Sequence, residues 1–295
     1  MMAHMLSMRE QVLLIVMLGL TSMILTRTSL VTGRKLHTSV VSTASRGIGL
    51  EFARQLLLQP DSVVYAVCRS EEIPDDLVEL RQKYSDNRLK VIGGVDLEDA
   101  SSIEDGYRRI AAECKEVDLL INCAGILGDN SAEQPGPERS ILKVDSEWLQ
   151  KTMSVNFISH VLMTQGIAPL MKRRAKKGET LSDDGTTKIV NISARVGSVS
   201  DNGLGGWLSY RCSKSALNQF TKTASIELKR HHCAVLSMHP GTTDTGLSKP
   251  FQKGLPAGQL MSTQEAVSKM LHVIRGASIE DTGSFYDYAG KRIEW

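Results

Sequence analysis

The chain has 295 residues, of which 41% are hydrophobic and 23% charged, which suits one large globular domain or, less readily, two. The formal net charge of +2 argues against nucleic acid as a main partner. The five cysteines are scattered, with no Cys-x-x-Cys pair and no histidine cluster, which argues against a disulfide framework or a zinc site and favours a reducing compartment.

The N-terminus differs in composition from the rest of the chain. Residues 12–25 are nearly all apolar, but a run of about 14 residues is short for a membrane span, which needs roughly 20. Glu10 is the only acid before residue 51, and basic, serine and threonine residues are frequent. We predict that residues 1–35 direct the protein to the mitochondrion or chloroplast and are then removed. A signal peptide, a retained anchor that would contact a membrane, and a misassigned start in a cytoplasmic protein are the alternatives.

A strand, a glycine-bearing turn and a helix follow in order. Val40–Ser42 is typical of the end of an apolar strand, and Leu50–Leu58 is amphipathic with a helical period. Between them lies Thr43-Ala44-Ser45-Arg46-Gly47-Ile48-Gly49. Such a turn brings a pyrophosphate close to the free N–H groups of a helix N-terminus. An ordinary turn between strand and helix explains this stretch equally well when it is taken alone.

Five more strands are predicted, in alternation with helical segments, and this pattern indicates a doubly wound parallel sheet. They span residues 62–68, 89–95, 117–121, 188–192 and 234–239. Several polar or glycine-bearing positions come directly after them: Arg69, Asp96-Leu97, Asn122-Cys123-Ala124-Gly125, Ser193 and Pro240-Gly241. A ligand of such a fold binds across the carboxyl ends of the strands, where these residues gather.

Tyr210 and Lys214 are four residues apart, so they lie on one face of a helix, one turn from each other. A free tyrosine has a pKa of about 10 and is a poor proton donor or acceptor at neutral pH. A nearby ammonium group favours the phenolate, so we expect Lys214 to lower the pKa of Tyr210. The pair would then exchange a proton with a carbonyl or alcohol oxygen near pH 7. The same spacing also occurs by chance on exposed helices.

From Leu36 to Trp295 the chain resembles the short-chain dehydrogenase/reductase family. The matching motifs stand in the family's order and are specific only together: Gly47-Ile48-Gly49, Asn122-Cys123-Ala124-Gly125, Tyr210 with Lys214, and Pro240-Gly241. The stretches Ser193–Ser198 and Gly205–Tyr210, with the ending Glu294-Trp295, look closest to the C-factor and sniffer-type carbonyl reductases, including plant and bacterial members. The resemblance implies one Rossmann-type α/β domain over residues 36–295, with a doubly wound, mostly parallel seven-stranded sheet and helices on both faces.

The resemblance also implies a nicotinamide cofactor and no metal. The residues that it assigns to cofactor binding are Ser45, Arg46, Gly47, Ile48, Gly49, Arg69, Asp96, Leu97, Asn122, Ala124, Gly125, Tyr210, Lys214, Pro240 and Thr242. Arg69 stands where an acidic residue would bind an adenosine ribose hydroxyl. Together with Arg46 it suits a 2′-phosphate instead, so we predict NADPH (or NADP) over NAD.

In the implied reaction, Tyr210 donates a proton to the substrate carbonyl oxygen as hydride reaches the carbon. Lys214 supports Tyr210 and holds the nicotinamide ribose. Asn156, inside a long helical segment, organises a relay water with Lys214, although an amide that only packs helices together is the alternative. The resemblance thus implies an NADPH-dependent reductase that converts an aldehyde or ketone to an alcohol.

Two positions depart from the family pattern. Thr43 replaces the first glycine of the phosphate turn, where a β-branched residue is unfavourable if φ is positive. Ala194 stands at the position of the family's catalytic serine. We assign Ser193 as the substitute, although its side chain points to the opposite face if the strand continues, and Ser198 is its rival. The loss of one donor to the developing oxyanion costs about 10²–10³-fold in rate.

The substrate pocket is expected from Leu204–Leu208, the loop after Gly125 and the segment Thr242–Met261, which has the composition of a lid. Trp207 is either an apolar wall of this pocket or a core anchor. These features suit a hydrophobic carbonyl compound. The family resemblance implies a homodimer or homotetramer. The alternative function, motivated by Thr43 and Ala194, is a signalling or scaffold protein that binds the cofactor with little or no catalysis.

Overall fold

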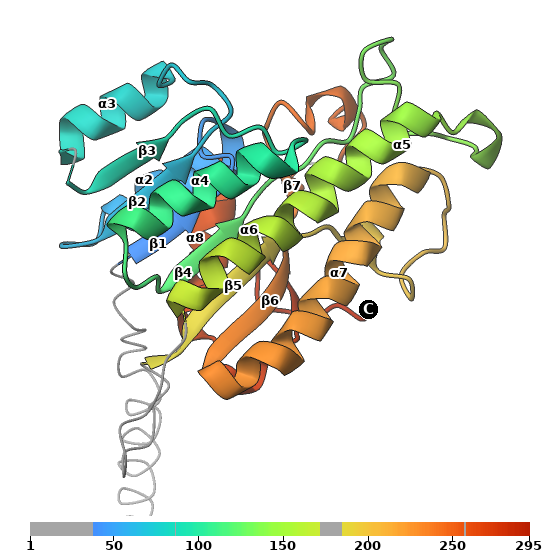
Figure 1. Cartoon of the computed structure of the whole chain (residues 1–295). Helices are drawn as coiled ribbons and strands as arrows, with labels where there is room; N and C mark the ends of the chain where they lie inside the picture. Colours follow the sequence, from blue (N-terminus) through green and yellow to red (C-terminus); the bar gives the residue numbers. More distant parts are fainter. Residues whose placement is uncertain (1–37, 86, 172–184, 257) are drawn as a thin grey trace, which may run out of the picture. The chain divides into compact units, whose positions relative to one another are not determined.

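Short apolar strands build a central sheet whose two faces are both buried (Figure 1). Within β1 (Thr38–Val41), Val40 packs into one hydrophobic core and Val41 into the other. Within β4 (Leu119–Asn122), Leu120 joins the core of Val40, whereas Leu119 and Ile121 join that of Val41. Because successive side chains of a strand point to opposite faces, these continuous apolar runs are what a sheet covered on both sides requires.

The computed structural model describes residues 38–295 except for residues 86, 172–184 and 257. The segment predicted to act in targeting, residues 1–35, lies outside the described residues, so its role stays a prediction. Among the helices that the structure describes, none is both long and apolar enough to cross a membrane.

Seven strands pair in the order β3-β2-β1-β4-β5-β6-β9, and every neighbouring pair is parallel. The other five strands are β2 (Val63–Val67), β3 (Leu89–Ile92), β5 (Thr187–Ile192), β6 (Cys233–His239) and β9 (Phe285–Asp287). The prediction of a doubly wound, seven-stranded sheet is confirmed. The strand order reverses between β1 and β4, and ligands of open α/β sheets bind beyond the carboxyl ends of the strands at such a reversal.

Helices cover the sheet on both faces (Figure 1). Three helices pack on the face that holds Val41, namely α2 (Gly47–Leu57), α3 (Asp75–Tyr84) and α8 (Thr263–Gly276). Three helices pack on the face that holds Val40, namely α4 (Ala100–Glu113), α6 (Ser159–Ile167) and α7 (Leu208–Leu228). The remaining α-helix of the described residues is α5 (Ser146–Met153).

The helical segment predicted around Asn156 is continuous but irregular. One π-helical stretch, Ser154–Ile158, joins α5 to α6 and contains Asn156, which is fully buried. Single π turns within α-helices are frequent at functional sites because they change the direction in which a side chain points.

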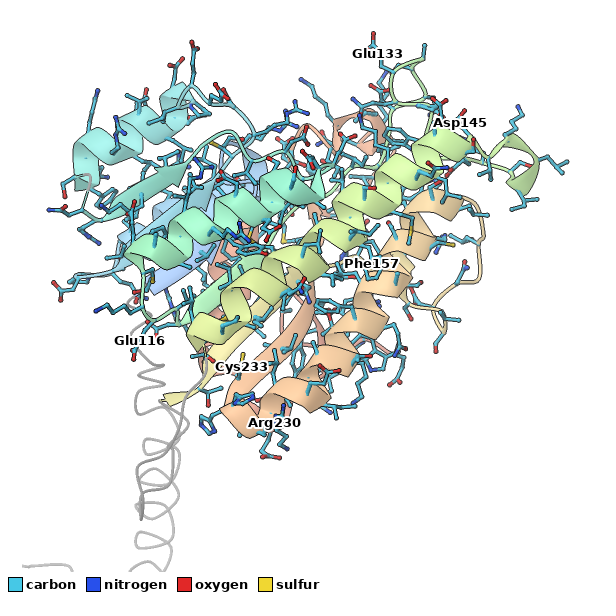
Figure 2. The ribbon with its side chains drawn as sticks, viewed as in Figure 1. Glu116, Glu133, Asp145, Phe157, Arg230 and Cys233 are labelled. Atoms are coloured by element: carbon cyan, nitrogen blue, oxygen red, sulfur yellow. The ribbon has the colours of Figure 1, made fainter. Side chains whose placement is uncertain are left out.

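The two ends of the sheet are easy to distinguish in Figure 2. Cys233 begins β6 and Arg230 precedes it, so both mark the end where the strands start. Glu133 and Asp145 come after β4 and lie at the opposite end. The residues predicted to bind cofactor and substrate follow the strands and therefore belong to this second, carboxyl end.

Candidate active site

Helix α7 carries Tyr210 and Lys214 on one buried face, as their spacing predicted. Tyr210 is 9% exposed and Lys214 2% exposed. The Lys214 ammonium group lies 5.9 Å from the centre of the Tyr210 ring. It donates a hydrogen bond of 2.9 Å to the carbonyl of Ile192, the last residue of β5, and lies 3.5 Å from the carbonyl of Ala124, which follows β4. The two side chains are therefore held over the carboxyl ends of β4 and β5.

The acid–base properties of this pair differ from the expectation. Burial raises the pKa of Tyr210 to about 12, and burial lowers the pKa of Lys214 to about 8. This net shift is opposite in direction to the predicted lowering of the Tyr210 pKa by Lys214, because desolvation of the buried hydroxyl disfavours the phenolate. Tyr210 is accordingly protonated at neutral pH, which is the form that donates a proton.

Asn156 fixes the chain segment that follows β4. Its amide oxygen accepts a hydrogen bond of 2.7 Å from the Ile126 N–H, and its amide nitrogen donates to the Ile126 carbonyl at 2.9 Å and to the Ser213 hydroxyl at 3.1 Å. A Cβ atom added to Gly125 would lie 3.7 Å from Lys214 Nζ and 3.9 Å from Asn156 Oδ1. The structure thus brings Gly125, Asn156 and Lys214 together, with the Asn156 side chain serving as a backbone clamp.

The turn between β1 and α2 has the features of a phosphate cradle. Arg46 is the N-cap residue, it makes no side-chain cap, and no acidic residue stands in the first turn of α2. The first N–H groups of a helix lack partners within the helix, and they favour an anion. A Cβ atom added to Gly49 would lie only 2.3 Å from the Thr43 carbonyl oxygen, so only glycine permits this approach of helix and turn. These residues fit a pyrophosphate.

Thr43 forms the turn in spite of its β-branched side chain. Its φ is +53°, in the left-handed region that favours glycine, and its hydroxyl donates a hydrogen bond of 2.7 Å to the Ser42 carbonyl. A residue held in this region typically stores about 1–3 kcal/mol of strain. The family's turn is therefore retained at an energetic cost.

The residues assigned to the adenosine half of the cofactor follow three neighbouring strands. Arg46 and Arg69 are exposed at the carboxyl ends of β1 and β2. Beyond β3, the Asp96 N–H donates to the Ser102 hydroxyl at 2.9 Å, and Leu97 is buried in the core that contains Val40. The exposed guanidinium groups lie on the side of the switch point where an adenosine 2′-phosphate would need them.

Asn122, one of the residues assigned to cofactor binding, directs its side chain into the interior. It is fully buried, and its amide nitrogen donates to Asn191 at 2.9 Å and to Thr164 at 3.0 Å. Its amide group joins β4 to β5 and α6, so a cofactor could meet only its backbone. Pro240 and Thr242, by contrast, are partly exposed beyond the end of β6.

No hydroxyl group replaces the family's serine next to Tyr210. Ala194 packs with Tyr210 and Leu127 in one small apolar cluster. The Ser193 hydroxyl donates a hydrogen bond of 2.7 Å to Asn218 Oδ1 in the interior, and the Ser198 hydroxyl accepts one of 3.1 Å from the Asp201 N–H. Both candidate serines are thus engaged in structural contacts, and the geometry favours neither as a donor to substrate.

Asn218 itself was missed from the sequence, although it lies four residues after Lys214 on the same helical face. Its amide nitrogen donates to the Gly197 carbonyl at 3.1 Å, and its oxygen accepts from Ser193 and Ser237. It therefore attaches α7 to the chain segment after β5. The spacing of Tyr210, Lys214 and Asn218 at intervals of four was the available signal.

The apolar side of the site is aromatic. Trp207 and Tyr210 are in edge contact, with ring centres 6.4 Å apart, and Trp207 lies 5.5 Å from the ring of Phe251. Phe251 belongs to the segment Thr242–Met261, which was predicted to act as a lid. Val196 packs against the same cluster. Trp207 consequently joins this segment to Tyr210, as a wall of an apolar site would.

Comparisons with known proteins agree with this geometry. The sequence model of the family described as short chain dehydrogenase matches residues 37–255. The C-signal protein of Myxococcus xanthus is 29% identical over 179 residues, which are 61% of this chain and 93% of that protein. The resemblance inferred from the motifs is thereby confirmed.

Two solved structures extend the comparison to the fold. An NADPH-bound carbonyl reductase from chicken fatty liver superimposes with a TM-score of 0.76 and 28% identity, covering 89% of this chain and 95% of that one. The carbonyl reductase Sniffer of D. melanogaster gives a TM-score of 0.75 over 88% of this chain and all of that one, at 24% identity, which supports the fold alone.

Proposed function

The chain belongs to the short chain dehydrogenase family, and from this premise we propose that it is an NADPH-dependent reductase of aldehydes and ketones. The observation that carries the proposal is the buried pair on α7: Tyr210 protonated beside Lys214, over the strand ends next to Gly125. A protonated donor suits reduction, whereas oxidation of an alcohol would begin from the phenolate. The chicken carbonyl reductase, which is NADPH-bound, supports the choice of cofactor.

The cofactor side of the proposal uses residues at the switch point. The N–H groups at the start of α2, with Gly47 and Gly49, would hold the pyrophosphate, and Arg46 and Arg69 would bind the 2′-phosphate. Lys214 would contact the nicotinamide ribose. NADPH, when bound, supplies the hydride that reduces the carbonyl carbon.

The chain's own part in the reaction is to orient the substrate and deliver a proton. The Tyr210 hydroxyl gives its proton to the carbonyl oxygen while negative charge develops there, and the Lys214 ammonium group stabilises the resulting phenolate. Ala194 offers no second donor, so Tyr210 bears most of the oxyanion stabilisation. We therefore expect a preference for reactive, electron-poor carbonyls, because they need less stabilisation of the developing oxyanion.

The substrate class follows from the walls of the site. Trp207, Phe251 and Leu127 present apolar or aromatic surface around Tyr210. Burial of such surface is worth about 25 cal/mol per Å², so a flat, hydrophobic carbonyl compound gains most from it. We propose aromatic aldehydes, aromatic ketones and quinones as the compounds to test.

Two further properties remain part of the proposal. Self-association as a homodimer or homotetramer is expected, and a monomer by analytical ultracentrifugation at micromolar concentration would contradict it. Delivery to a mitochondrion or chloroplast by residues 1–35 is expected as well. A fusion of these residues to a fluorescent protein that stayed in the cytoplasm would contradict that expectation.

The test is NADPH oxidation by the purified protein with a panel of such carbonyls, beside an NADH control and the variant Tyr210→Phe. We expect turnover with NADPH that exceeds turnover with NADH and that falls at least about a hundredfold in Tyr210→Phe. Equal turnover in Tyr210→Phe and the unaltered protein would refute the proposed proton donor. No NADPH binding at all would refute the proposed function.

The second candidate function is a signalling or scaffold protein that binds the cofactor with little catalysis. Two observations favour it: Thr43 strains the phosphate turn, and Ala194 removes a donor from the site. A scaffold would bind NADPH without turnover of any carbonyl in the panel. Its biological activity would also survive in Tyr210→Phe, whereas that of a reductase would be lost.

A further inference from the structure

The helix that carries Tyr210 begins without a cap of its own. Trp207 is its N-cap residue, has a φ of +54° in the left-handed region, and makes no side-chain cap. Leu208 is half-buried, and Ser209 and Tyr210 are buried, Ser209 fully so. Because the first N–H groups of a helix have no partner within the helix, a buried start needs acceptors from another part of the chain.

Glu138 supplies these acceptors from the loop that follows β4. One carboxylate oxygen accepts a hydrogen bond of 3.2 Å from the Ser209 N–H, and the other accepts one from the Ser209 hydroxyl. The backbone carbonyl of Glu138 accepts from the Trp207 N–H. Glu138 is only 4% exposed, and a carboxylate at the N-terminus of a helix is favoured by the helix dipole and by charge-assisted hydrogen bonds.

The loop that carries Glu138 is itself fixed from the other side. A Cβ atom added to Gly136 would lie 2.1 Å from Trp148 Nε1 of α5, so backbone and indole are in tight contact. The Gly136 carbonyl accepts a hydrogen bond of 2.8 Å from the Asn130 N–H. Glu138 thus joins a loop anchored on α5 to the first turn of α7.

We propose that Glu138 is a positioning residue for the proton donor: it fixes the first turn of α7, and with it the places of Tyr210 and the Trp207 wall. Tyr210 directly follows Ser209, whose N–H donates to the Glu138 carboxylate. The Tyr210 ring contacts the ring of Trp207, whose N–H donates to the Glu138 carbonyl. This inference rests on the proposed reductase function. A residue that only stabilised the fold would not alter the chemical step.

Asp281 provides a matched control at the opposite end of the sheet. Its carboxylate accepts the N–H of Ser278 at 2.8 Å and the hydroxyl of Ser278 at 3.0 Å, the same pair of donors that Glu138 accepts from Ser209. It lies just before β9, next to the start of β6, because the Gly283 N–H bonds to the Val235 carbonyl. Asp281 also accepts a hydrogen bond of 2.7 Å from the Tyr286 hydroxyl, so its removal takes away the Ser278 contacts and one more, at a distance from the first turn of α7.

The experiment compares Glu138→Ala, Glu138→Gln and Asp281→Ala in kcat, KM for the carbonyl, Kd for NADPH, unfolding midpoint and amide hydrogen exchange. In Glu138→Ala, we expect kcat to fall about tenfold to a hundredfold, since a small misplacement of a reacting group costs that much. We expect an unchanged Kd for NADPH and faster exchange confined to residues 207–214. Glu138→Gln, whose amide oxygen still accepts one hydrogen bond, should recover most of kcat.

The outcomes separate this inference from the proposed function. Equal kcat and equal exchange at residues 207–214 in Glu138→Ala and Asp281→Ala would overturn the positioning role. If Glu138→Ala fails to fold, Ser209→Ala takes its place, and the same two readouts decide. If the unaltered protein shows no turnover, the proposed function fails. Hydrogen exchange alone then tests the positioning of α7. Faster exchange at residues 207–214 in Glu138→Ala would support it, and unchanged exchange would contradict it.

Discussion

Replacement of Lys214 by methionine tests the electrostatics of the site through protein stability. The Lys214 ammonium group is 2% exposed, and burial lowers its pKa from 10.5 to about 8. The unfolded chain therefore binds more protons than the folded chain between about pH 8 and pH 10.5. In that window the free energy of unfolding rises with pH, because the folded protein sheds a buried charge that costs it stability at lower pH.

The magnitude follows from the two pKa values. One pKa unit corresponds to about 1.36 kcal/mol, so linkage gives a cost of about 3 kcal/mol at pH 7 and about 1 kcal/mol at pH 10. The unaltered protein should gain about 2 kcal/mol relative to Lys214→Met between these pH values. Methionine keeps the length of the side chain and removes the charge, so the difference isolates the titration.

The measurement is urea denaturation of both proteins at half-unit steps from pH 7 to pH 10, with Lys222→Met as the control. Lys222 lies on the same helix but is exposed, so its removal alters surface charge without emptying a buried position. We expect the stability difference to close for Lys214→Met and to stay nearly constant for Lys222→Met. Parallel curves for the unaltered protein and Lys214→Met would refute the assignment of a buried, strained ammonium group.

Gly49, His160 and Arg69 provide further tests of the phosphate turn, the buried core and the cofactor choice. Gly49→Ala should lower the free energy of unfolding by about 1–3 kcal/mol and weaken NADPH binding, because its Cβ would lie 2.3 Å from a backbone oxygen. The control Gly276→Ala, with open space around it, should be neutral. Equal denaturation midpoints for the two variants would refute this prediction. Burial lowers the pKa of His160 to about 3, so the unfolded state binds more protons than the folded state between pH 6.5 and pH 3, and stability falls as pH falls. In urea denaturation, His160→Gln should avoid about 2–3 kcal/mol of the stability lost between pH 7 and pH 4.5, and identical acid sensitivity would contradict this. Arg69→Asp should raise the Kd for NADPH about tenfold to a hundredfold and leave the Kd for NADH nearly unchanged, because only NADPH carries the 2′-phosphate. Fluorescence titrations measure both constants, and an equal effect on both cofactors would exclude a 2′-phosphate contact.

Much of the fold was predictable because apolar periodicity determines it. The predicted strands at 62–68 and 188–192 overlap β2 and β5, and the helix after the glycine turn begins at Gly47. The three-residue strand β9 was not identified from its own residues, since a run that short carries little periodicity. The family resemblance gave the number of strands, seven, but not the position of β9.

The site was predictable where one residue type serves one local geometry. The helical spacing of Tyr210 and Lys214 depends on the local backbone alone and was found. The φ of Thr43 was left open by the sequence, and the structure gives it the positive value at which a β-branched residue is unfavourable. The pKa of Tyr210 was not predictable, because it depends on how deeply the fold buries the phenol.

Contacts between distant segments could not be predicted from the sequence either, because they also depend on the tertiary fold. Glu138 stands in a polar, proline-bearing loop, where an acid is expected to be solvated, and only the tertiary fold places it beside Ser209, 71 residues away. Ser193 looked like a catalytic hydroxyl because it adjoins Ala194. Its true direction depends on Asn218, which approaches from α7.

The central claim is that Tyr210 supplies the proton while hydride comes from NADPH. The most direct measurement is a single turnover: protein loaded with NADPH is mixed with a reactive aromatic ketone, and loss of NADPH absorbance is followed for the unaltered chain and for Tyr210→Phe. We expect Tyr210→Phe to bind NADPH normally and to react about 10²–10⁴-fold more slowly. Equal single-turnover rates for the two proteins would contradict it.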